Sequence, residues 1–286
     1  MPTRMSPELI SHISASVRGA LAEDVGSGDL TAALVPATQR ATATIITRDG
    51  AVICGQPWVQ EVFRQLDPGI VLEWHLGEGD DSTKEQTLCT LNGPARPLLT
   101  GERTALNFLQ TLSAVASASR ACAEAVAGTR AQILDTRKTI PGLRLAQKYA
   151  VRVGGGTNHR MGLHDGILIK ENHIVAAGGI ASAVSRARDQ GAGVLVEVEV
   201  ENLAQAEEAM AAGADRLLLD NFSVGLMSEA VALRDRQAPR ITLEASGGIN
   251  FETLRPVAET GVDFISIGAL TKNIRAVDLS MRFRFT

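Results

Sequence analysis

The sequence predicts an α/β protein in which a small α+β domain precedes a (β/α) barrel. Two observations predict this fold. The chain has 286 residues, which at roughly 150 residues per domain favours two domains or one large barrel with an addition. Turn-rich segments with alternating apolar residues occupy the first hundred positions, whereas strand-like and helix-like segments alternate from Ala131 onward.

Short strands separated by tight turns are expected in the N-terminal part. Apolar and polar residues alternate over 41–47 and 70–76, as they do in strands with one buried face. Gly and Pro residues mark turns beside these segments, at Asp49-Gly50, at 67–69 and at 92–94. This pattern predicts a small α+β domain.

An alanine-rich segment is expected to form the helix that joins the two domains. It extends from Glu102 to about Ala127. Thr100 has the side chain of an N-cap residue, and Gly128 can adopt the left-handed conformation that ends a helix.

Six strand-like segments then alternate with helix-like ones. Strands are expected over 131–135, 166–170, 194–200, 216–220, 241–244 and 263–267, and helices over 180–190, 202–212, 223–234 and 250–260. A parallel strand needs a crossover of about ten or more residues, which this spacing allows. Six units predict a (β/α) barrel, complete or incomplete, over 113–271, with an open doubly wound sheet as the alternative. The first domain then covers 1–112, with residues 272–286 packing back on it.

Composition excludes several classes of function. The 28 basic and 32 acidic residues leave a net charge of −4, and aromatic residues make up 3%, so nucleic acid is not an expected partner. Cys54, Cys89 and Cys122 form no CxxC pair, which argues against a zinc site or a disulfide framework and for a reducing compartment. No apolar stretch approaches the roughly 20 residues of a membrane span. We expect a cytoplasmic protein with no membrane partner.

The run Val196–Glu201 carries an acidic face. Period-two alternation places Glu197, Glu199 and Glu201 on one side of the strand and three valines on the other. If the acidic side points into a barrel, cations must lie beside it, either basic side chains such as Lys170 or a divalent metal. The alternative is an edge strand with a solvated acidic face.

Basic residues concentrate on the joining helix and near the ends of the predicted strands. They are Arg103, Arg137, Lys138, His159, Arg160 and Lys170. Because arginine binds carboxylates and phosphates through two parallel hydrogen bonds and lysine acts as a point charge, this group suits a substrate with several anionic groups. Lys148, on the following helix, is expected at the surface. His173 is open between strand-end packing and support of a site.

Two glycine turns follow the last two strands, at Ser246-Gly247-Gly248 and at Ile267-Gly268-Ala269. Backbone N–H groups in such turns bind phosphate, and barrels often place a phosphate on their last two βα loops. The alternative is an ordinary tight βα connection at each position.

Long motifs in this sequence resemble the quinolinate phosphoribosyltransferase family. They include Asp-Thr-Arg-Lys-Thr-Ile-Pro-Gly-Leu-Arg at 135–144, Gly-Gly-Gly-Thr-Asn-His-Arg-Met-Gly-Leu at 154–163, and the segments 23–31, 101–107, 148–151, 168–174, 196–201, 219–222, 268–271 and 278–282. The resemblance covers nearly the whole chain and keeps the motifs in order.

The resemblance implies an N-terminal α+β sandwich domain on an incomplete α/β barrel, assembled as a homodimer or hexamer. It also implies the reaction of quinolinate with 5-phosphoribosyl 1-pyrophosphate and Mg²⁺. The products are nicotinate mononucleotide, pyrophosphate and carbon dioxide, in NAD biosynthesis.

Roles for individual residues follow from the resemblance. The carboxylates of quinolinate would be contacted by Arg137, His159, Arg160, Lys170 and, from the neighbouring subunit, Arg103. Thr136 would also bind substrate, and the catalytic residues would be Lys138, Lys170, Glu199 and Asp220. The two acidic residues would hold the ribose hydroxyls and, through the phosphoribosyl donor, Mg²⁺. The 5-phosphate would bind Ser246, Gly247, Gly248, Ile267, Gly268 and Ala269.

Three alternatives stay open at this point. A molybdenum-associated branch shares much of the pattern and would use another substrate. Lys170 at a strand end could form a Schiff base in an aldolase-like lyase. A non-catalytic phosphate-binding or scaffold protein is the third, although it gives Glu199 and Asp220 no purpose.

Overall fold

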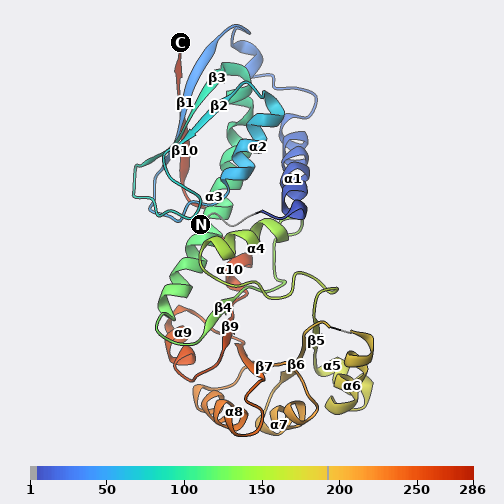
Figure 1. Cartoon of the computed structure of the whole chain (residues 1–286). Coiled ribbons are helices and arrows are strands. Elements are labelled where there is room, and N and C mark those ends of the chain that lie inside the picture. Colours follow the sequence, from blue (N-terminus) through green and yellow to red (C-terminus); the bar gives the residue numbers. More distant parts are fainter. Residues whose placement is uncertain (1–4, 192) are drawn as a thin grey trace. The chain divides into compact units, whose positions relative to one another are not determined.

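The computed structural model describes residues 5–191 and 193–286, and the chain forms two compact units (Figure 1). The first unit contains the residues up to Arg120, Thr139–Gly155 and Leu270–Thr286. The second contains Ala121–Lys138 and Gly156–Ala269.

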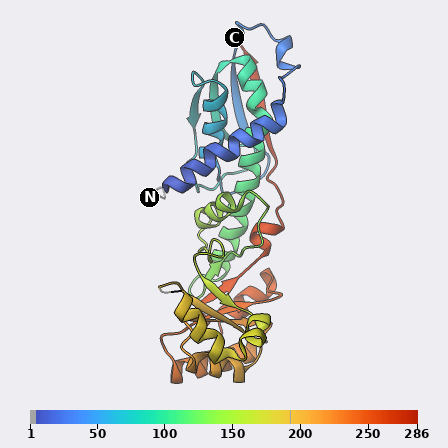
Figure 2. The ribbon, with the colours of Figure 1, turned by 90° about the vertical axis from the view of Figure 1, so that its right-hand side faces the viewer.

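A four-stranded antiparallel sheet, in the order β10-β1-β3-β2, forms the centre of the first unit. Its strands are β1 (Arg40–Thr47), β2 (Val71–Trp74), β3 (Thr87–Pro94) and β10 (Leu279–Phe285). The other elements are α1 (Pro7–Val25), the 3₁₀ turn η1 (Ala32–Leu34), α2 (Gln56–Leu66), α3 (Ala95–Ala125), α4 (Arg144–Val153) and α10 (Ala269–Lys272). Figure 2 shows α1 and α2 in front of this sheet. The pairing of β10 with β1 attaches the C-terminal residues to the sheet.

Alternation along β1 produces the core of this unit. Ala43 and Ile45 are fully buried, whereas Thr42 and Thr44, which alternate with them, are half-buried. Helix α2 buries one apolar face with Trp58, Val59, Val62 and Phe63, because residues three or four apart share a helix side.

The connecting helix begins earlier than predicted. α3 extends over 31 residues from Ala95, so Thr100 lies inside the helix and is not its N-cap. Pro97 falls in the first turn, where a missing N–H removes no intrahelical bond, so the helix can start before it. Thr100 Oγ1 instead lies 2.9 Å from Asp29 Oδ2 and 3.0 Å from the carbonyl of Arg96.

The prediction for Lys148 is wrong, since this side chain is fully buried in α4. The helix buries six consecutive residues, from Ala146 to Val151. Burial of six consecutive residues covers every side of the helix in this stretch, so a lysine within it has no solvated position.

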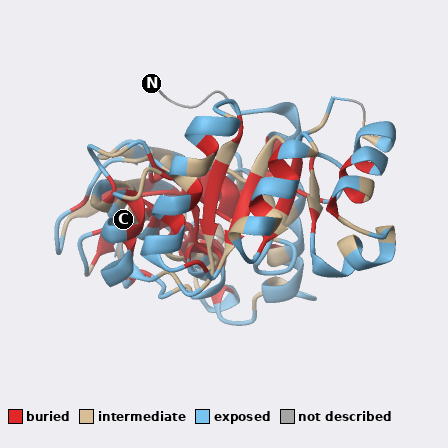
Figure 3. Ribbon diagram, turned by 90° about the horizontal axis from the view of Figure 1, so that it is seen from below, coloured by how far each residue is buried: buried red, intermediate tan, exposed pale blue. Residues whose placement is uncertain are grey.

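Six parallel strands form the sheet of the second unit in the order β4-β9-β8-β7-β6-β5. They are β4 (Gln132–Leu134), β5 (Ile167–Ile169), β6 (Val196–Val200), β7 (Arg216–Asp220), β8 (Thr242–Ser246) and β9 (Phe264–Ser266). The helices are α5 (Glu171–Ala177), α6 (Ile180–Gln190), α7 (Leu203–Ala211), α8 (Val224–Gln237) and α9 (Phe251–Ala258). Figure 3 shows buried strands and exposed outer helix faces.

The strand order confirms the predicted barrel and shows that it is incomplete. Strands β5 to β9 follow one another in chain order and β4 lies beside β9, whereas no ladder joins β4 to β5 within the described residues. A doubly wound sheet would reverse its order in the middle. The edge-strand alternative for Val196–Val200 is also wrong, because β6 pairs with β5 on one side and β7 on the other.

The strands are apolar toward the helices and polar toward the barrel interior. Leu217, Leu219 and Leu243 are fully buried. The residues in the opposite phase include Arg216, Asp220 and Glu244, so the interior carries charges. No helix in the described part of the chain combines the length and apolarity that a membrane span requires.

Candidate active site

Three charged side chains lie at the carboxyl ends of neighbouring strands. Lys170 follows β5, Glu199 is near the end of β6 and Asp220 ends β7. Lys170 Nζ forms an ion pair with Glu199 Oε2, and Asn221 Nδ2 donates a hydrogen bond of 2.9 Å to Asp220 Oδ2. The carboxyl ends of parallel strands meet at one edge, so a cation and two carboxylates converge where barrel sites form.

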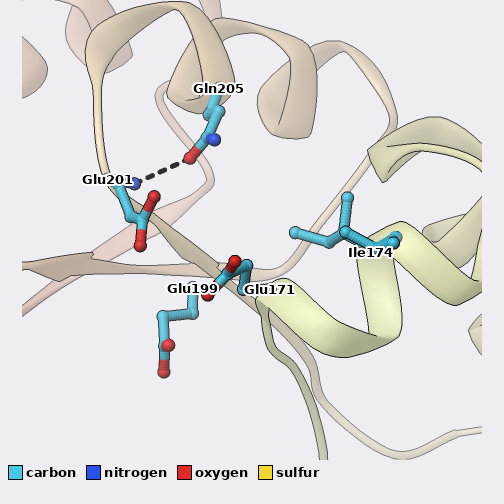
Figure 4. A pocket seen from close by; sticks show the side chains of 6 residues that line it. Glu171, Ile174, Glu199, Glu201 and Gln205 are labelled. Atoms are coloured by element: carbon cyan, nitrogen blue, oxygen red, sulfur yellow. Dashed lines mark hydrogen bonds between the residues drawn. The ribbon is translucent and has the colours of Figure 1, made fainter.

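A pocket opens beside Glu199, between the end of β6 and helices α5 and α7 (Figure 4). Glu171, Ile174, Val175, Glu199, Glu201 and Gln205 line it. Gln205 Oε1 accepts a hydrogen bond of 2.8 Å from the backbone N–H of Glu201, which fixes one wall. Glu199 is among the lining residues, but its side chain points away from Gln205 and Ile174 in Figure 4, and its carboxylate pairs with Lys170.

Below this edge, a buried group of charges surrounds His159. Its Nε2 lies 2.9 Å from Glu197 Oε2 and 3.4 Å from Glu244 Oε2. Arg216 Nη1 lies 3.3 Å from the same Glu244 oxygen, and its guanidinium stacks 4.2 Å from the centre of the Phe264 ring. The cations beside the buried acidic face are thus His159 and Arg216. The sequence pattern predicted a basic side chain such as Lys170, or a metal, beside this face, and Lys170 forms its ion pair with Glu199.

The carboxylates change the protonation of this group. Burial disfavours a charged imidazole at His159, whereas the hydrogen bonds and charges of Glu197 and Glu244 oppose this lowering of the pKa and favour a proton on Nε2. Burial and the charge of Glu244 raise the pKa of Glu197 to about 7. The backbone N–H of Arg160 opposes a second ring proton, because it donates to Nδ1 over 2.7 Å. That amide carries its proton at every pH, so we assign the ring proton to Nε2.

The same group has the composition of a metal site. Ligand atoms of His159, Glu197 and Glu244 all lie within 4.8 Å of one another. However, Arg216 already supplies positive charge beside Glu244, and the His159 Nε2–H faces both carboxylates. These contacts argue against a cation at this position.

Asp135 fixes the loop that carries His159. The side chain is fully buried after β4, where it accepts hydrogen bonds from Asn158 Nδ2 at 2.5 Å and from the backbone N–H of His159 at 2.9 Å. The next residue, Arg160, donates from Nη1 to the carbonyl of Gly166 over 3.0 Å. Two consecutive residues of the loop are therefore held from both sides.

The positive charge of Arg137 acts on Arg160. Burial lowers the pKa of Arg160, and the charge of Arg137 lowers it further. Mutual repulsion of two cations is unfavourable unless an anion can lie between them. The pair is consistent with an anion site.

The turns after β4 and β9 lie side by side, since these strands are paired. Thr136 Oγ1 accepts the backbone N–H of Lys138 at 3.0 Å. A Cβ atom at Gly268 would lie 3.0 Å from Lys138 Cδ, so the stem of this lysine lies over the turn of Ile267 and Ala269.

The turn after β8 needs glycine. Gly247 has φ +97° and Gly248 has φ +61°, a region that favours glycine. The backbone N–H of Asn221 donates to the carbonyl of Ser246 at 3.0 Å, so the turns after β7 and β8 are tied together.

Comparison with known proteins shows a family match over both units. Residues 29–113 match the quinolinate phosphoribosyl transferase N-terminal domain, and residues 115–282 match its C-terminal domain. The chain belongs to the quinolinate phosphoribosyltransferase family.

Relatives in this family match over nearly their full length. A probable nicotinate-nucleotide pyrophosphorylase [carboxylating] of Bacillus subtilis is 42% identical over 91% of this chain and 89% of its own. A nicotinate-nucleotide pyrophosphorylase [carboxylating] of Mycobacterium leprae is also 42% identical, over 93% and 95%. The structure of the nicotinate-nucleotide pyrophosphorylase from Francisella tularensis has a TM-score of 0.93 at 45% identity, with 98% of each chain covered.

The structure brings most of the residues expected from the quinolinate phosphoribosyltransferase resemblance into one unit. Thr136, Arg137, Lys138, His159, Arg160, Lys170, Glu199, Asp220, Ser246, Gly247, Gly248, Ile267, Gly268 and Ala269 all belong to the second unit. Arg103 belongs to the first unit, exposed on α3. His173 Nδ1 accepts the backbone N–H of Lys170 at 3.0 Å, so it caps α5 and supports the lysine's position.

Arg216 is the residue of this quinolinate phosphoribosyltransferase site that the sequence reasoning missed, together with the pairing of Glu197 and Glu244. A signal was available, because Arg216 is in period-two phase with Asp220 on the same strand and must face the same side.

Proposed function

We propose that the chain transfers the phosphoribosyl group of 5-phosphoribosyl 1-pyrophosphate to quinolinate, with decarboxylation to nicotinate mononucleotide in NAD biosynthesis. The observation that carries this proposal is the meeting of cations and carboxylates at the ends of β4 to β7. The cations can bind a dicarboxylate substrate, and the carboxylates can stabilise a sugar that develops positive charge.

Quinolinate would bind at the cationic side of the site. Arg137 and Arg160 repel one another, and a substrate carboxylate between them removes this repulsion. Arginine forks match planar carboxylates in two parallel hydrogen bonds, which also orient the pyridine ring. Lys170 would neutralise the second carboxylate.

The phosphoribosyl donor would bind along the turns after β4, β8 and β9. Backbone N–H groups of Gly247, Gly248 and Gly268 would hold the 5-phosphate, and Lys138, whose stem lies over the last turn, would face the pyrophosphate. Glu199 and Asp220 would hold the ribose hydroxyls.

Mg²⁺ fits the donor set of this site. Glu199 and Asp220 offer the carboxylate oxygens that Mg²⁺ prefers, on adjacent strands, and Mg²⁺ usually binds through a few carboxylates together with substrate phosphates. Bound with the donor, Mg²⁺ would neutralise charge on the leaving pyrophosphate.

The residues can support both steps without a covalent intermediate on the protein. In the first step the pyridine nitrogen forms a bond to the anomeric carbon, and the electrons of the broken C–O bond leave with pyrophosphate. Positive charge grows on the ribose in this step, and the carboxylates of Glu199 and Asp220 stabilise it.

Decarboxylation follows from the charge on the new pyridinium. The bond from the ring to the carboxylate beside nitrogen breaks, its electron pair stays on that ring carbon, and a solvent proton replaces carbon dioxide. The arginines need only hold the carboxylate in orientation and exclude water. We assign no strong general base.

Assembly completes the proposal. We propose a homodimer or hexamer in which a second copy supplies Arg103, which is exposed on α3. We also propose that the protein works in the reducing cytoplasm, and the free cysteines Cys54, Cys89 and Cys122 support this.

The test is a stoichiometric assay. Quinolinate, the donor and Mg²⁺ should yield nicotinate mononucleotide, pyrophosphate and carbon dioxide in equal amounts, and chelation of Mg²⁺ should stop turnover. Absence of product with quinolinate, or trapping of a substrate on Lys170 by borohydride, would contradict the proposal. Family membership favours the transferase over the lyase alternative.

A further inference from the structure

Three charges of the barrel interior have no part in the mechanism above. Glu197, Arg216 and Glu244 lie on the barrel interior below Lys170, Glu199 and Asp220, and the two glutamates are 0% and 1% exposed. Burying a carboxylate costs several kcal/mol of desolvation unless partners compensate it. Within the described residues, neither oxygen of Glu197 accepts a well-aligned hydrogen bond, and its close contact is the 2.9 Å approach to His159.

His159 has protein partners at both ring nitrogens. Nδ1 accepts the backbone N–H of Arg160 at 2.7 Å, and Nε2 faces Glu197 and Glu244. The backbone N–H of His159 is also bound, to Asp135. A substrate carboxylate needs a donor, yet Nδ1 is an acceptor here and Nε2 already points at two carboxylates.

We propose that His159 is a positioning residue that holds Arg160 in place without contacting quinolinate, and that Glu197 and Glu244 position His159 in turn. This inference rests on the function proposed above. Arg160 receives the effect directly, because its backbone N–H binds the imidazole and its guanidinium binds the carbonyl of Gly166.

Repulsion between the two arginines explains why such a clamp is useful. The charge of Arg137 disfavours the charged Arg160 before substrate arrives, so contacts that hold the loop of Arg160 in place work against this repulsion. The imidazole of His159 links the backbone of Arg160 to the carboxylates of the barrel interior, and this link keeps the loop in place. Arg216 stabilises the arrangement because it compensates the second carboxylate and is itself held over Phe264.

A double-mutant cycle of Glu197→Gln and His159→Gln tests the proposal. Each single variant should raise KM for quinolinate roughly tenfold, because misplacing a binding group weakens every contact that it makes. KM for the phosphoribosyl donor should stay within twofold. The double variant should match His159→Gln within twofold, since both changes release the same loop. Glu208→Gln, the same chemical change on exposed α7, should leave both constants unaltered.

Additive losses in the cycle would overturn the proposal, because a histidine that binds quinolinate directly acts independently of Glu197. If Glu197→Gln fails to fold, Glu244→Gln replaces it in the cycle with the same expectation. Nitrogen-15 spectra of ring-labelled protein give a readout besides activity. His159 should show a protonated Nε2 and an unprotonated Nδ1, unchanged when quinolinate is added. A shift of either ring nitrogen on binding would also overturn it.

These outcomes are distinct from failure of the proposed function. If the wild-type protein forms no nicotinate mononucleotide, the function fails as a whole. The spectrum of the unliganded protein then decides the position of His159 by itself, and a protonated Nδ1 would show that the clamp does not form.

Discussion

A Cβ atom at Gly247 would lie 2.2 Å from Oδ1 of Asn221, far inside van der Waals contact. The Gly247→Ala variant must therefore move the turn after β8 or the Asn221 side chain, and it must also place alanine at φ +97°. Because both effects strain the folded state, we expect the free energy of unfolding to fall by roughly 1–3 kcal/mol. Chemical denaturation measures this loss.

The matched control is Gly248→Ala. This residue also has positive φ, at +61°, but a Cβ atom there meets nothing within 4 Å. The free energy of unfolding of this variant should fall by about 1 kcal/mol, because only the backbone conformation is strained. Equal losses in the two variants would show that the contact with Asn221 has no energetic effect.

Lys170→Ala and Arg137→Ala should each lower kcat/KM at least a hundredfold, the order of effect expected for a lost charge at the reacting groups. The first also leaves Glu199 without its ion-pair partner. Because both side chains are exposed at strand ends, circular dichroism and thermal unfolding should remain close to wild type. Activity near the wild-type value with either variant would contradict the site.

Glu61 provides a pH-dependent contribution to stability in α2. Hydrogen bonds from Arg64 lower the pKa of Glu61 from 4.5 to about 2. Because the folded state binds this proton less tightly than the unfolded chain, the contribution is complete above pH 4.5 and is lost as pH falls toward 2. Glu61→Gln should therefore lower the free energy of unfolding at pH 7 by at most about 1 kcal/mol, since the arginine is exposed.

The difference between Glu61→Gln and wild type should disappear by about pH 2 in urea titrations. Glu259→Gln removes another exposed ion pair, with Arg255, and its effect on the free energy of unfolding is compared with that of Glu61→Gln. A wild-type advantage that grows as the solution becomes more acidic would have the wrong sign and would exclude this origin.

Much of the barrel could be predicted from the sequence because its repeats are regular. The helix expected over 180–190 matches α6 at both ends, and each parallel strand lies within its predicted segment except β8, which ends two residues beyond it. The start of α3 was harder, since Pro97 reads as a break although the first turn of a helix accepts it. The local sequence does not show whether a proline breaks a helix or lies in its first turn. Packing of the surrounding residues decides between the two.

The charged interior was only partly predictable. Alternation showed that Glu197 and Glu199 share a face, yet it could not show which cations lie opposite them. Those partners come from neighbouring strands and from a loop: Arg216 on β7, and His159 ahead of β5. Register between strands is a tertiary property, and one sequence carries no direct signal for it.

Mixing two inactive variants tests whether the site is shared between copies. Arg103 lies in the first unit and Lys138 in the second, so Arg103→Ala and Lys138→Ala damage different units of the chain. If a second copy supplies Arg103, a heterodimer contains one site with both residues mutated and one site with neither. Free subunit exchange in a symmetric dimer should then restore about a quarter of wild-type activity in an equal mixture. Native mass spectrometry confirms the exchange, and an inactive mixture after complete exchange would show that Arg103 acts within its own chain.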